Sequence, residues 1–156
     1  MVRSGVRVGI DVGKVRIGVS RSDLHGMLAT PVETVARSED GADRLRIAGI
    51  VTELEAFEVI VGLPLALSGA HTASTDDAVD FARTLAADLD ADVRLVDERL
   101  STVSAHSALR ASGRNSKSAR PVVDQVAATI ILQHALDAER AAGRPPGTLV
   151  VPNIGS

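Results

Sequence analysis

The chain has 156 residues, a formal net charge of −3 and no cysteine. This length allows one domain with a core of its own, and the lack of cysteine excludes disulfide bonds, a thiolate nucleophile and a thiolate zinc site. The N-terminus turns directly into a strand pattern without a signal peptide, and no apolar run approaches the ~20 residues that span a membrane. We therefore expect a soluble, cytoplasmic protein.

The first 35 residues predict a three-stranded antiparallel meander. Apolar and polar residues alternate over 6–12, and a Gly-Lys turn at 13–14 leads to a second run at 15–20, which predicts a β-hairpin. A third strand is expected at 27–35. Pro31 marks that strand as an edge or bulged strand, because proline cannot donate a ladder hydrogen bond.

The rest of the chain alternates helices with short apolar strands. The expected elements are a helix at about 41–54, a strand at 59–61, a helix from Ser74 to about 88, a strand at 93–96, a helix at 102–111 and a final helix opened by Pro121 and ending near 141. Leu45, Ala48 and Val51 have helical spacing in the first helix. Ser74, with Asp77 three residues on, resembles a capping box for the second.

This order predicts an α/β fold in one domain over residues 1–142. A meander followed by helix crossovers gives a mixed five-stranded sheet, in which three antiparallel strands join parallel strands and helices flank both faces. Residues 143–156 are expected to form a loop-like tail with at most one short strand, at 148–151. Ligands of such sheets gather at the carboxyl ends of the strands.

Three acidic residues fall at element ends that can meet at one edge of this sheet. Asp11 ends the first strand, Glu98 follows a late strand, and Asp124 is expected in the first turn of the final helix. Hard cations such as Mg²⁺ take oxygen ligands and keep waters for phosphate groups, so the three carboxylates suit phosphodiester chemistry. Taken singly, each acid also fits a local role, such as the hairpin turn for Asp11, a loop for Glu98 or the helix dipole for Asp124.

Two of these acids are expected to face the interior of the domain. Asp11 shares a strand face with Gly9, and Asp124 shares a helix stripe with Ala128 and Ile131. An uncompensated buried carboxylate costs several kcal/mol, roughly, so inward acids favour a paired or metal-bound role over a local one.

Four motifs together resemble a known family. GIDVGKVRIGVSRSD at 9–23, VIVGLP at 59–64, DERLS at 97–101 and VDQVAATIILQ at 123–133 are similar, in this order, to the bacterial YqgF family, also called RuvX. This is a ribonuclease H-like group whose members are described as Holliday junction resolvases and as pre-16S rRNA nucleases. The resemblance implies the ribonuclease H-like fold, with Asp11, Glu98 and Asp124 at the family's three acidic active-site positions.

The resulting hypothesis is a hydrolase, a metal-dependent endonuclease that cuts structured nucleic acid. Two Mg²⁺ (or Mn²⁺) ions would be held by Asp11, Glu98 and Asp124, which would be both metal ligands and catalytic residues. The residues expected to bind the phosphates of the nucleic acid are Lys14, Arg16, Arg114, Lys117 and Arg120. The substrate is expected to be the 5′ end of precursor 16S rRNA in ribosome biogenesis, or alternatively branched DNA in recombination and repair. Junction resolution by paired nicks would favour a homodimer.

Two other classes of protein share parts of the pattern. Asp11-Val12-Gly13 followed by Arg16-Ile17-Gly18 also resembles the phosphate-binding hairpin of actin-like ATPases, but those proteins generally need two such domains and do not require Glu98 or Asp124. A non-catalytic ribosome-associated adaptor that binds nucleic acid is the other alternative. Nuclease activity that is lost in Asp11→Asn would separate an enzyme from an adaptor.

Overall fold

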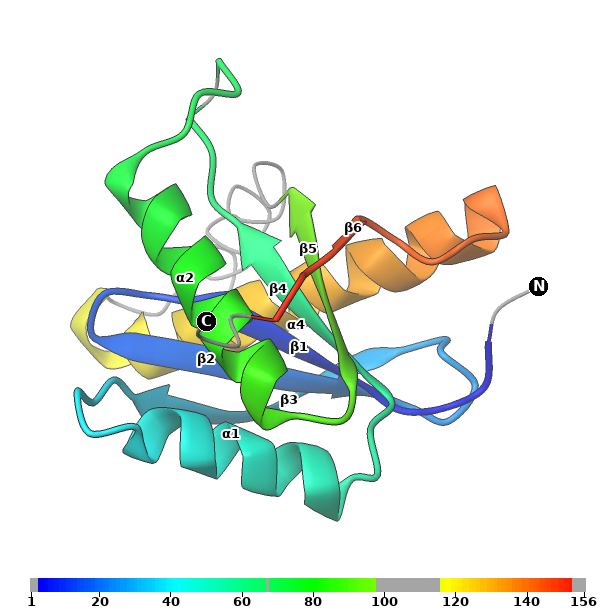
Figure 1. The fold of residues 1–156 in the computed structure, drawn as a ribbon, viewed down its shortest axis with the longest axis horizontal. Coiled ribbons are helices and arrows are strands. Elements are labelled where there is room, and N and C mark those ends of the chain that lie inside the picture. The colour runs from blue at the N-terminus through cyan, green and yellow to red at the C-terminus, as the bar shows by residue number, and fades with distance from the viewer. Residues whose placement is uncertain (1–2, 67, 98–115, 153–156) are drawn as a thin grey trace.

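The computed structural model describes residues 3–66, 68–97 and 116–152, and these form a sheet with helices on both faces (Figure 1). The elements in chain order are β1 (Arg7–Val12), β2 (Arg16–Ser22), β3 (Ala29–Ala36), α1 (Ala42–Glu53), β4 (Glu58–Leu63), α2 (Ala73–Asp88), β5 (Asp92–Asp97), α4 (Ser116–Ala142) and β6 (Thr148–Leu149). None of the described helices is long and apolar enough to cross a bilayer.

The sheet has six strands in the order β3-β2-β1-β4-β5-β6. The predicted meander is present, because β1 pairs antiparallel with β2 and β2 with β3. Strands β4 and β5 are parallel to β1 and to each other, as expected for strands joined by helix crossovers. The mixed α/β class is thus confirmed, with six strands where the sequence predicted five.

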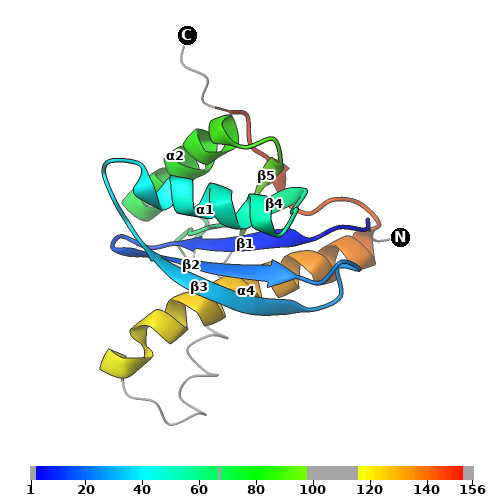
Figure 2. The ribbon, with the colours of Figure 1, turned by 90° about the horizontal axis from the view of Figure 1, so that it is seen from below.

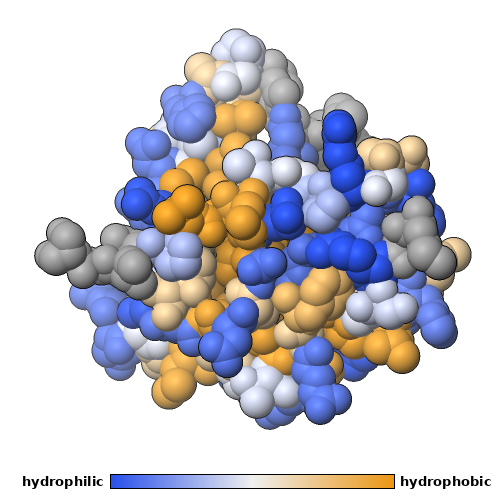
Figure 3. All heavy atoms as spheres, turned by 45° about the vertical axis from the view of Figure 1, so that its right-hand side comes forward, coloured by the Kyte–Doolittle hydropathy of each residue, from blue (hydrophilic) through white to orange (hydrophobic). Residues whose placement is uncertain are grey.

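The additional strand, β6, lies in the segment expected to be loop-like. Thr148 and Leu149 pair antiparallel with Leu95 and Arg94 of β5. Val150 is 7% exposed and belongs to the hydrophobic core, whereas Val151 is 72% exposed. The face of the molecule around β6 mixes hydrophilic and hydrophobic side chains (Figure 3). The strand falls within 148–151, where the sequence analysis allowed one short strand, and it is two residues long.

Helices α1 and α2 cover one face of the sheet, and α4 covers the other (Figure 2). Alternation along each strand divides the side chains between these two layers. Val8 and Ile10 of β1 pack in the larger core with residues of α1 and α2, while Ile60 of β4 packs with Ile131 and Leu132 of α4. Successive residues of β1 and of β2 therefore face the larger core and α4 in turn.

Some helix details differ from the sequence prediction. Leu45 is 75% exposed, and the inward face of α1 is formed by Asp43, Ile47, Ile50 and Val51. The first turn of α2 is capped by Thr72, whose hydroxyl accepts from the Thr75 amide while the Thr75 hydroxyl accepts from the Thr72 amide. The predicted capping by Ser74 is therefore wrong, because a cap residue must precede the helix and Ser74 lies within it.

Helix α4 begins at Ser116, five residues before the predicted start at Pro121. Proline is most often found in the first turn, where its missing N–H has no partner to lose, and here it lies further inside the helix. Asp124 consequently lies beyond the first turn. The predicted helix at 102–111 lies outside the described residues.

Candidate functional site

Glycines allow α4 to cross the sheet in direct contact with the backbone of β1 and β2. A Cβ atom on Gly18 would overlap the carbonyl group of Asp124 and lie 3.1 Å from its Cα atom. A Cβ atom on Gly9 would lie 2.7 Å from the Cβ of Leu132 and 3.0 Å from the Ala128 carbonyl oxygen. Both contacts are closer than a larger residue permits, so the two glycines determine where Asp124 passes over β2.

Asp11 lies beside this crossing. It is the Cα partner of Gly18 in the β1–β2 ladder, and paired residues present their side chains to the same face of the sheet. The Ser20 hydroxyl donates a 2.8 Å hydrogen bond to the Ala128 carbonyl, which holds α4 against the same face. The structure therefore brings Asp11 and Asp124, which are far apart in the sequence, to the same glycine.

Arg16 forms an ion pair with Asp124 across this crossing. Its Nε lies 2.8 Å from Oδ2 of Asp124, and the two side chains are 33% and 19% exposed. The sequence predicted a phosphate contact for Arg16, whereas the structure places its guanidinium on a carboxylate that was predicted to bind metal. The pair compensates the charge of a half-buried acid that would otherwise be costly.

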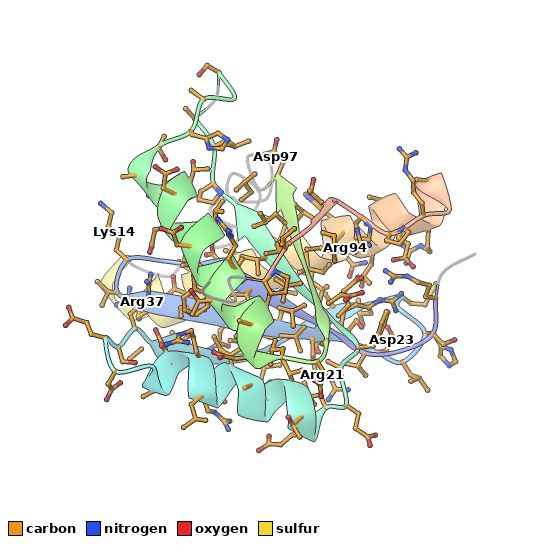
Figure 4. All side chains as sticks on the ribbon, in the orientation of Figure 1. Lys14, Arg21, Asp23, Arg37, Arg94 and Asp97 are labelled. Atoms are coloured by element: carbon orange, nitrogen blue, oxygen red, sulfur yellow. The ribbon has the colours of Figure 1, made fainter. Side chains whose placement is uncertain are left out.

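Three of the remaining predicted site residues lie in a turn or at the start of a helix. Lys14 is exposed in the turn between β1 and β2, and Figure 4 shows it at the tip of that hairpin. Lys117 and Arg120 lie in the N-terminal turns of α4, where the backbone is described and the side chains are not. Glu98 and Arg114 lie outside the described residues.

The carboxyl ends of β1, β4 and β5 lie on one edge of the sheet, as parallel pairing requires. Asp97, the last residue of β5, is paired with Leu63 of β4, is exposed, and lies at the tip of its strand (Figure 4). Its strand parity is that of Val93 and Leu95, which pack with the larger core away from α4. Among the described residues, which do not include Glu98, no three His, Asp or Glu side chains form a group that could hold a metal ion.

Arg37 is a residue of this region that the sequence analysis did not identify. It follows β3 directly, and its Nη1 donates a 2.9 Å hydrogen bond to the carbonyl oxygen of Gly13, in the β1–β2 turn. The same guanidinium donates to both carboxylate oxygens of Asp77 on α2, at 2.9 and 3.1 Å. A single arginine after a strand has no recognisable pattern in a sequence, so only the fold shows what it joins.

A buried ionic network lies at the other end of α4. Glu139, 2% exposed, accepts from Arg3 and from Arg7, while Glu58 accepts from Arg3 and Arg94. Burial raises the pKa of Glu139, but the hydrogen bonds from Arg3 and the nearby charges of Arg3 and Arg7 outweigh burial, so the pKa lies below its usual value. The network fixes the C-terminal half of α4 to β1, β4 and β5, and the glycine contacts fix its N-terminal half.

Comparison with known proteins places this arrangement in a family. A family model described as RuvX, Holliday junction resolvase, matches residues 5–138. The chain belongs to the RuvX family. The resemblance seen in the four sequence motifs is thereby confirmed.

Curated relatives of this RuvX-family chain match along nearly its whole length. A protein of Leifsonia xyli subsp. xyli is 76% identical over 154 residues, covering 99% of both chains. One of Clavibacter michiganensis subsp. michiganensis is 64% identical, covering 97% of this chain and 95% of its own. Both are provisionally named pre-16S rRNA nucleases.

Solved structures confirm the fold class. The structure of T. thermophilus RuvC in complex with a Holliday junction substrate superposes with a TM-score of 0.57 at 18% sequence identity, covering 90% of this chain and 99% of the RuvC chain. A second Thermus thermophilus RuvC structure gives a TM-score of 0.53. At this identity the likeness establishes the ribonuclease H-like fold alone.

Proposed function

We propose that this RuvX-family protein is a metal-dependent endonuclease that hydrolyses phosphodiester bonds in precursor 16S rRNA. The observation that carries the proposal is the crossing of β2 by α4 at Gly18. This crossing positions Asp124 beside Asp11 on the α4 face of the sheet. Glu98, the third acid of the proposed site, directly follows Asp97 in the sequence, and Asp97 ends β5 at the sheet edge where β1 also ends.

The donor atoms of the proposed site suit a hard divalent cation. Asp11, Glu98 and Asp124 would hold Mg²⁺ or Mn²⁺, since all three supply carboxylate oxygens and the chain has no thiolate. In the structure a guanidinium already lies against Asp124, so the position accommodates positive charge. When bound, such ions lower the pKa of a coordinated water and stabilise charge on the leaving oxygen.

Basic residues near the three acids would bind the substrate. Lys14 is exposed at the tip of the hairpin, and Lys117 and Arg120 lie in the N-terminal turns of α4, so both the hairpin and the start of α4 carry cations. Together with Arg114 they would hold backbone phosphates and orient the bond to be cleaved. Phosphate contacts carry no information about base sequence, so recognition would depend on the shape of the nucleic acid.

The choice of precursor rRNA as substrate is supported by the names of the curated relatives, while the family description favours a Holliday junction. The two substrates would be cut by the same carboxylates. A junction resolvase makes paired nicks and would act as a two-fold dimer, whereas removal of an rRNA leader needs one cut per molecule.

The test is a side-by-side cleavage assay on precursor 16S rRNA and on a four-way DNA junction, with Mg²⁺ and with EDTA. Wild type should cut the rRNA at the 5′ end of the mature sequence, and Asp11→Asn and Asp124→Asn should abolish the cut. Asp97→Asn is the matched control. Asp97 is exposed at the same sheet edge, but its place in the strand alternation is that of residues that face the larger core and not α4. It should retain activity.

Each other outcome changes the proposal in a defined way. Cleavage of the junction alone would identify a resolvase, and analytical ultracentrifugation should then show a dimer. Tight binding of both substrates without cleavage by wild type would identify an adaptor. Full cleavage in EDTA would exclude the metal-dependent mechanism.

A further inference from the structure

Both the backbone amide and the guanidinium of Arg37 donate hydrogen bonds to the turn between β1 and β2. Within the turn the Gly13 amide donates to the Arg16 carbonyl at 2.9 Å, and a Cβ on Gly13 would lie 2.5 Å from that oxygen. The Arg37 amide donates to the Val15 carbonyl at 2.9 Å, and its Nη1 donates to the Gly13 carbonyl at 2.9 Å. Arg37 therefore satisfies two of the carbonyl groups that the turn presents.

The guanidinium of Arg37 is itself held in place by both helices on the far face. Asp77 of α2 binds it through both oxygens, Asp43 of α1 lies 3.7 Å from its Nε, and the ring of Phe81 lies 5.3 Å beneath it. Hydrogen bonding with Asp77 raises the pKa of Arg37, and the same contact lowers the pKa of Asp77, so both groups stay charged. A bidentate pair of this kind fixes orientation as well as distance.

We propose that Arg37 is a positioning residue for the nuclease site, joining the turn that follows Asp11 to helix α2. The turn begins two residues after Asp11 and ends at Arg16, the partner of Asp124. Arg37 acts by holding the backbone on which two residues of the site depend. The inference rests on the proposed function, because it assigns Arg37 a role in that same site.

Loss of this residue should reduce turnover more than substrate binding. A displacement of about 1 Å in a reacting group can cost about 100-fold in rate, so Arg37→Ala should lower kcat about 10- to 100-fold and leave KM within about twofold. The half-saturating Mn²⁺ concentration should rise. Arg37→Lys should recover part of the loss, because one ammonium can reach Gly13 or Asp77 but cannot reproduce the fork.

The matched control is Arg44→Ala. Arg44 pairs with Asp88 at 2.8 Å and likewise joins α1 to α2, but it makes no contact with the turn. If Arg37 serves only to hold the helices together, both variants should behave alike at equal folded fraction. Asp77→Asn, which keeps Arg37 but removes half of its anchorage, should give an intermediate loss of turnover.

Two measurements do not depend on cleavage and separate this inference from the proposed function. Hydrogen exchange over residues 11–18 and binding of Mn²⁺ by electron paramagnetic resonance report the turn and the metal ligands directly. Faster exchange and weaker Mn²⁺ binding in Arg37→Ala, with no change in Arg44→Ala, would support the inference even if wild type cleaves neither substrate. Unchanged exchange and unchanged Mn²⁺ affinity in Arg37→Ala would overturn it, whatever wild type cleaves.

Discussion

The charge of Arg16 should influence the affinity of Asp124 for a metal ion, because the two side chains form an ion pair. In the proposed site its guanidinium would compete with a metal for the same carboxylate, so Arg16→Gln should bind Mn²⁺ about two- to fivefold more tightly, equivalent to the roughly 0.5–1 kcal/mol of a partly exposed ion pair. Cleavage should nevertheless become slower, because the ion pair that orients the Asp124 side chain is lost. Calorimetric titration of Mn²⁺ alongside a cleavage assay measures both effects.

The control for this variant is Arg21→Gln. Arg21 lies on the same strand as Arg16 but has the parity of Ile17 and Val19, which pack in the larger core away from α4. Its replacement should leave Mn²⁺ affinity unchanged. Equal or weaker Mn²⁺ binding in Arg16→Gln would mean that the ion pair does not compete with metal.

Gly18 should tolerate no side chain. The added methyl of Gly18→Ala would overlap the carbonyl group of Asp124. This group belongs to the backbone of α4 and cannot move aside as a flexible side chain could, so the free energy of unfolding should fall by about 3 kcal/mol or more. Gly49→Ala is the matched control, because nothing lies within 4 Å of a Cβ there and the residue is inside α1. It should raise stability by about 0.5–1 kcal/mol. Urea unfolding of both variants tests this, and a similar small effect in the two would show that α4 is not seated on Gly18.

For individual residues, the sequence could predict only which face of a helix or strand they occupy, because that follows from local periodicity. The stripe of Asp124, Ala128 and Ile131 has the expected inward face, with Ala128 and Ile131 at 0% and 1% exposure. The partner of Arg16 could not be predicted, because an arginine binds a carboxylate or a phosphate equally well and only the fold decides which is near.

The seating of α4 also depends on the ionic network at its C-terminal half. Glu139→Gln leaves Arg7 without a buried counter-charge, so at neutral pH the free energy of unfolding should fall by about 3–5 kcal/mol. Glu33→Gln is the control, since its pair with Arg46 is largely exposed and should contribute less than about 1 kcal/mol.

The effect of Glu139 should depend on pH in a defined direction. Its folded-state pKa lies below the ordinary value, so its stabilisation is fully present above the unfolded pKa of about 4.3 and is lost as pH falls through the folded pKa. The difference between wild type and Glu139→Gln should therefore shrink below about pH 4. A difference that stays constant from pH 7 to pH 3 would contradict the ionic origin.

The segment that follows β6 should contribute to stability through one buried side chain, Val150. Val150→Ala removes buried methyl groups and should lower the free energy of unfolding by about 1–2 kcal/mol, whereas Val151→Ala should change it by less than about 0.5 kcal/mol. Thermal unfolding of the two variants compares adjacent valines that differ in burial. Equal losses would show that β6 does not close the core.

At the scale of elements, strands were predicted better than helix ends. A run of β-branched residues marks β4, and a short run of mostly apolar residues marks β5. The Thr72 cap of α2 depends on a reciprocal hydrogen bond that several nearby Ser and Thr residues could have made. Pro121 suggested a helix start because proline usually opens a helix, and the five residues before it show no apolar period.

The whole molecule has a net charge of −3, yet nucleic-acid binding should respond to three cations near the start of α4. Replacing Arg114, Lys117 and Arg120 together with Ala should lower the slope of log affinity against log salt by about 2–3 units. The control replaces Arg44, Arg46 and Arg83 on α1 and α2, which removes the same charge from the opposite face of the sheet. Filter binding at several salt concentrations should find its slope unchanged, and equal slopes for both triple variants would place the substrate elsewhere.

The topology of the whole molecule followed from the order of the elements. Strands joined by short turns pair antiparallel, and strands joined by a helix run parallel, so the alternation in the sequence predicted the mixture of antiparallel and parallel strands in the sheet. The closure of the site could not be predicted in the same way, because the approach of α4 to β1 and β2 is set by three-dimensional contacts at Gly9 and Gly18.

The contact between Arg16 and Asp124 spans 108 residues of chain, and this separation has a consequence for synthesis. A ribosome adds about 5–20 residues per second, so the hairpin exists for roughly 5–20 s before Asp124 is made. Helix α4 packs against β1, β2, β3 and β4, so the acids on its face of the sheet meet only after α4 has been made. A nascent chain that has not yet reached α4 therefore emerges beside ribosomal RNA without the assembled site proposed here.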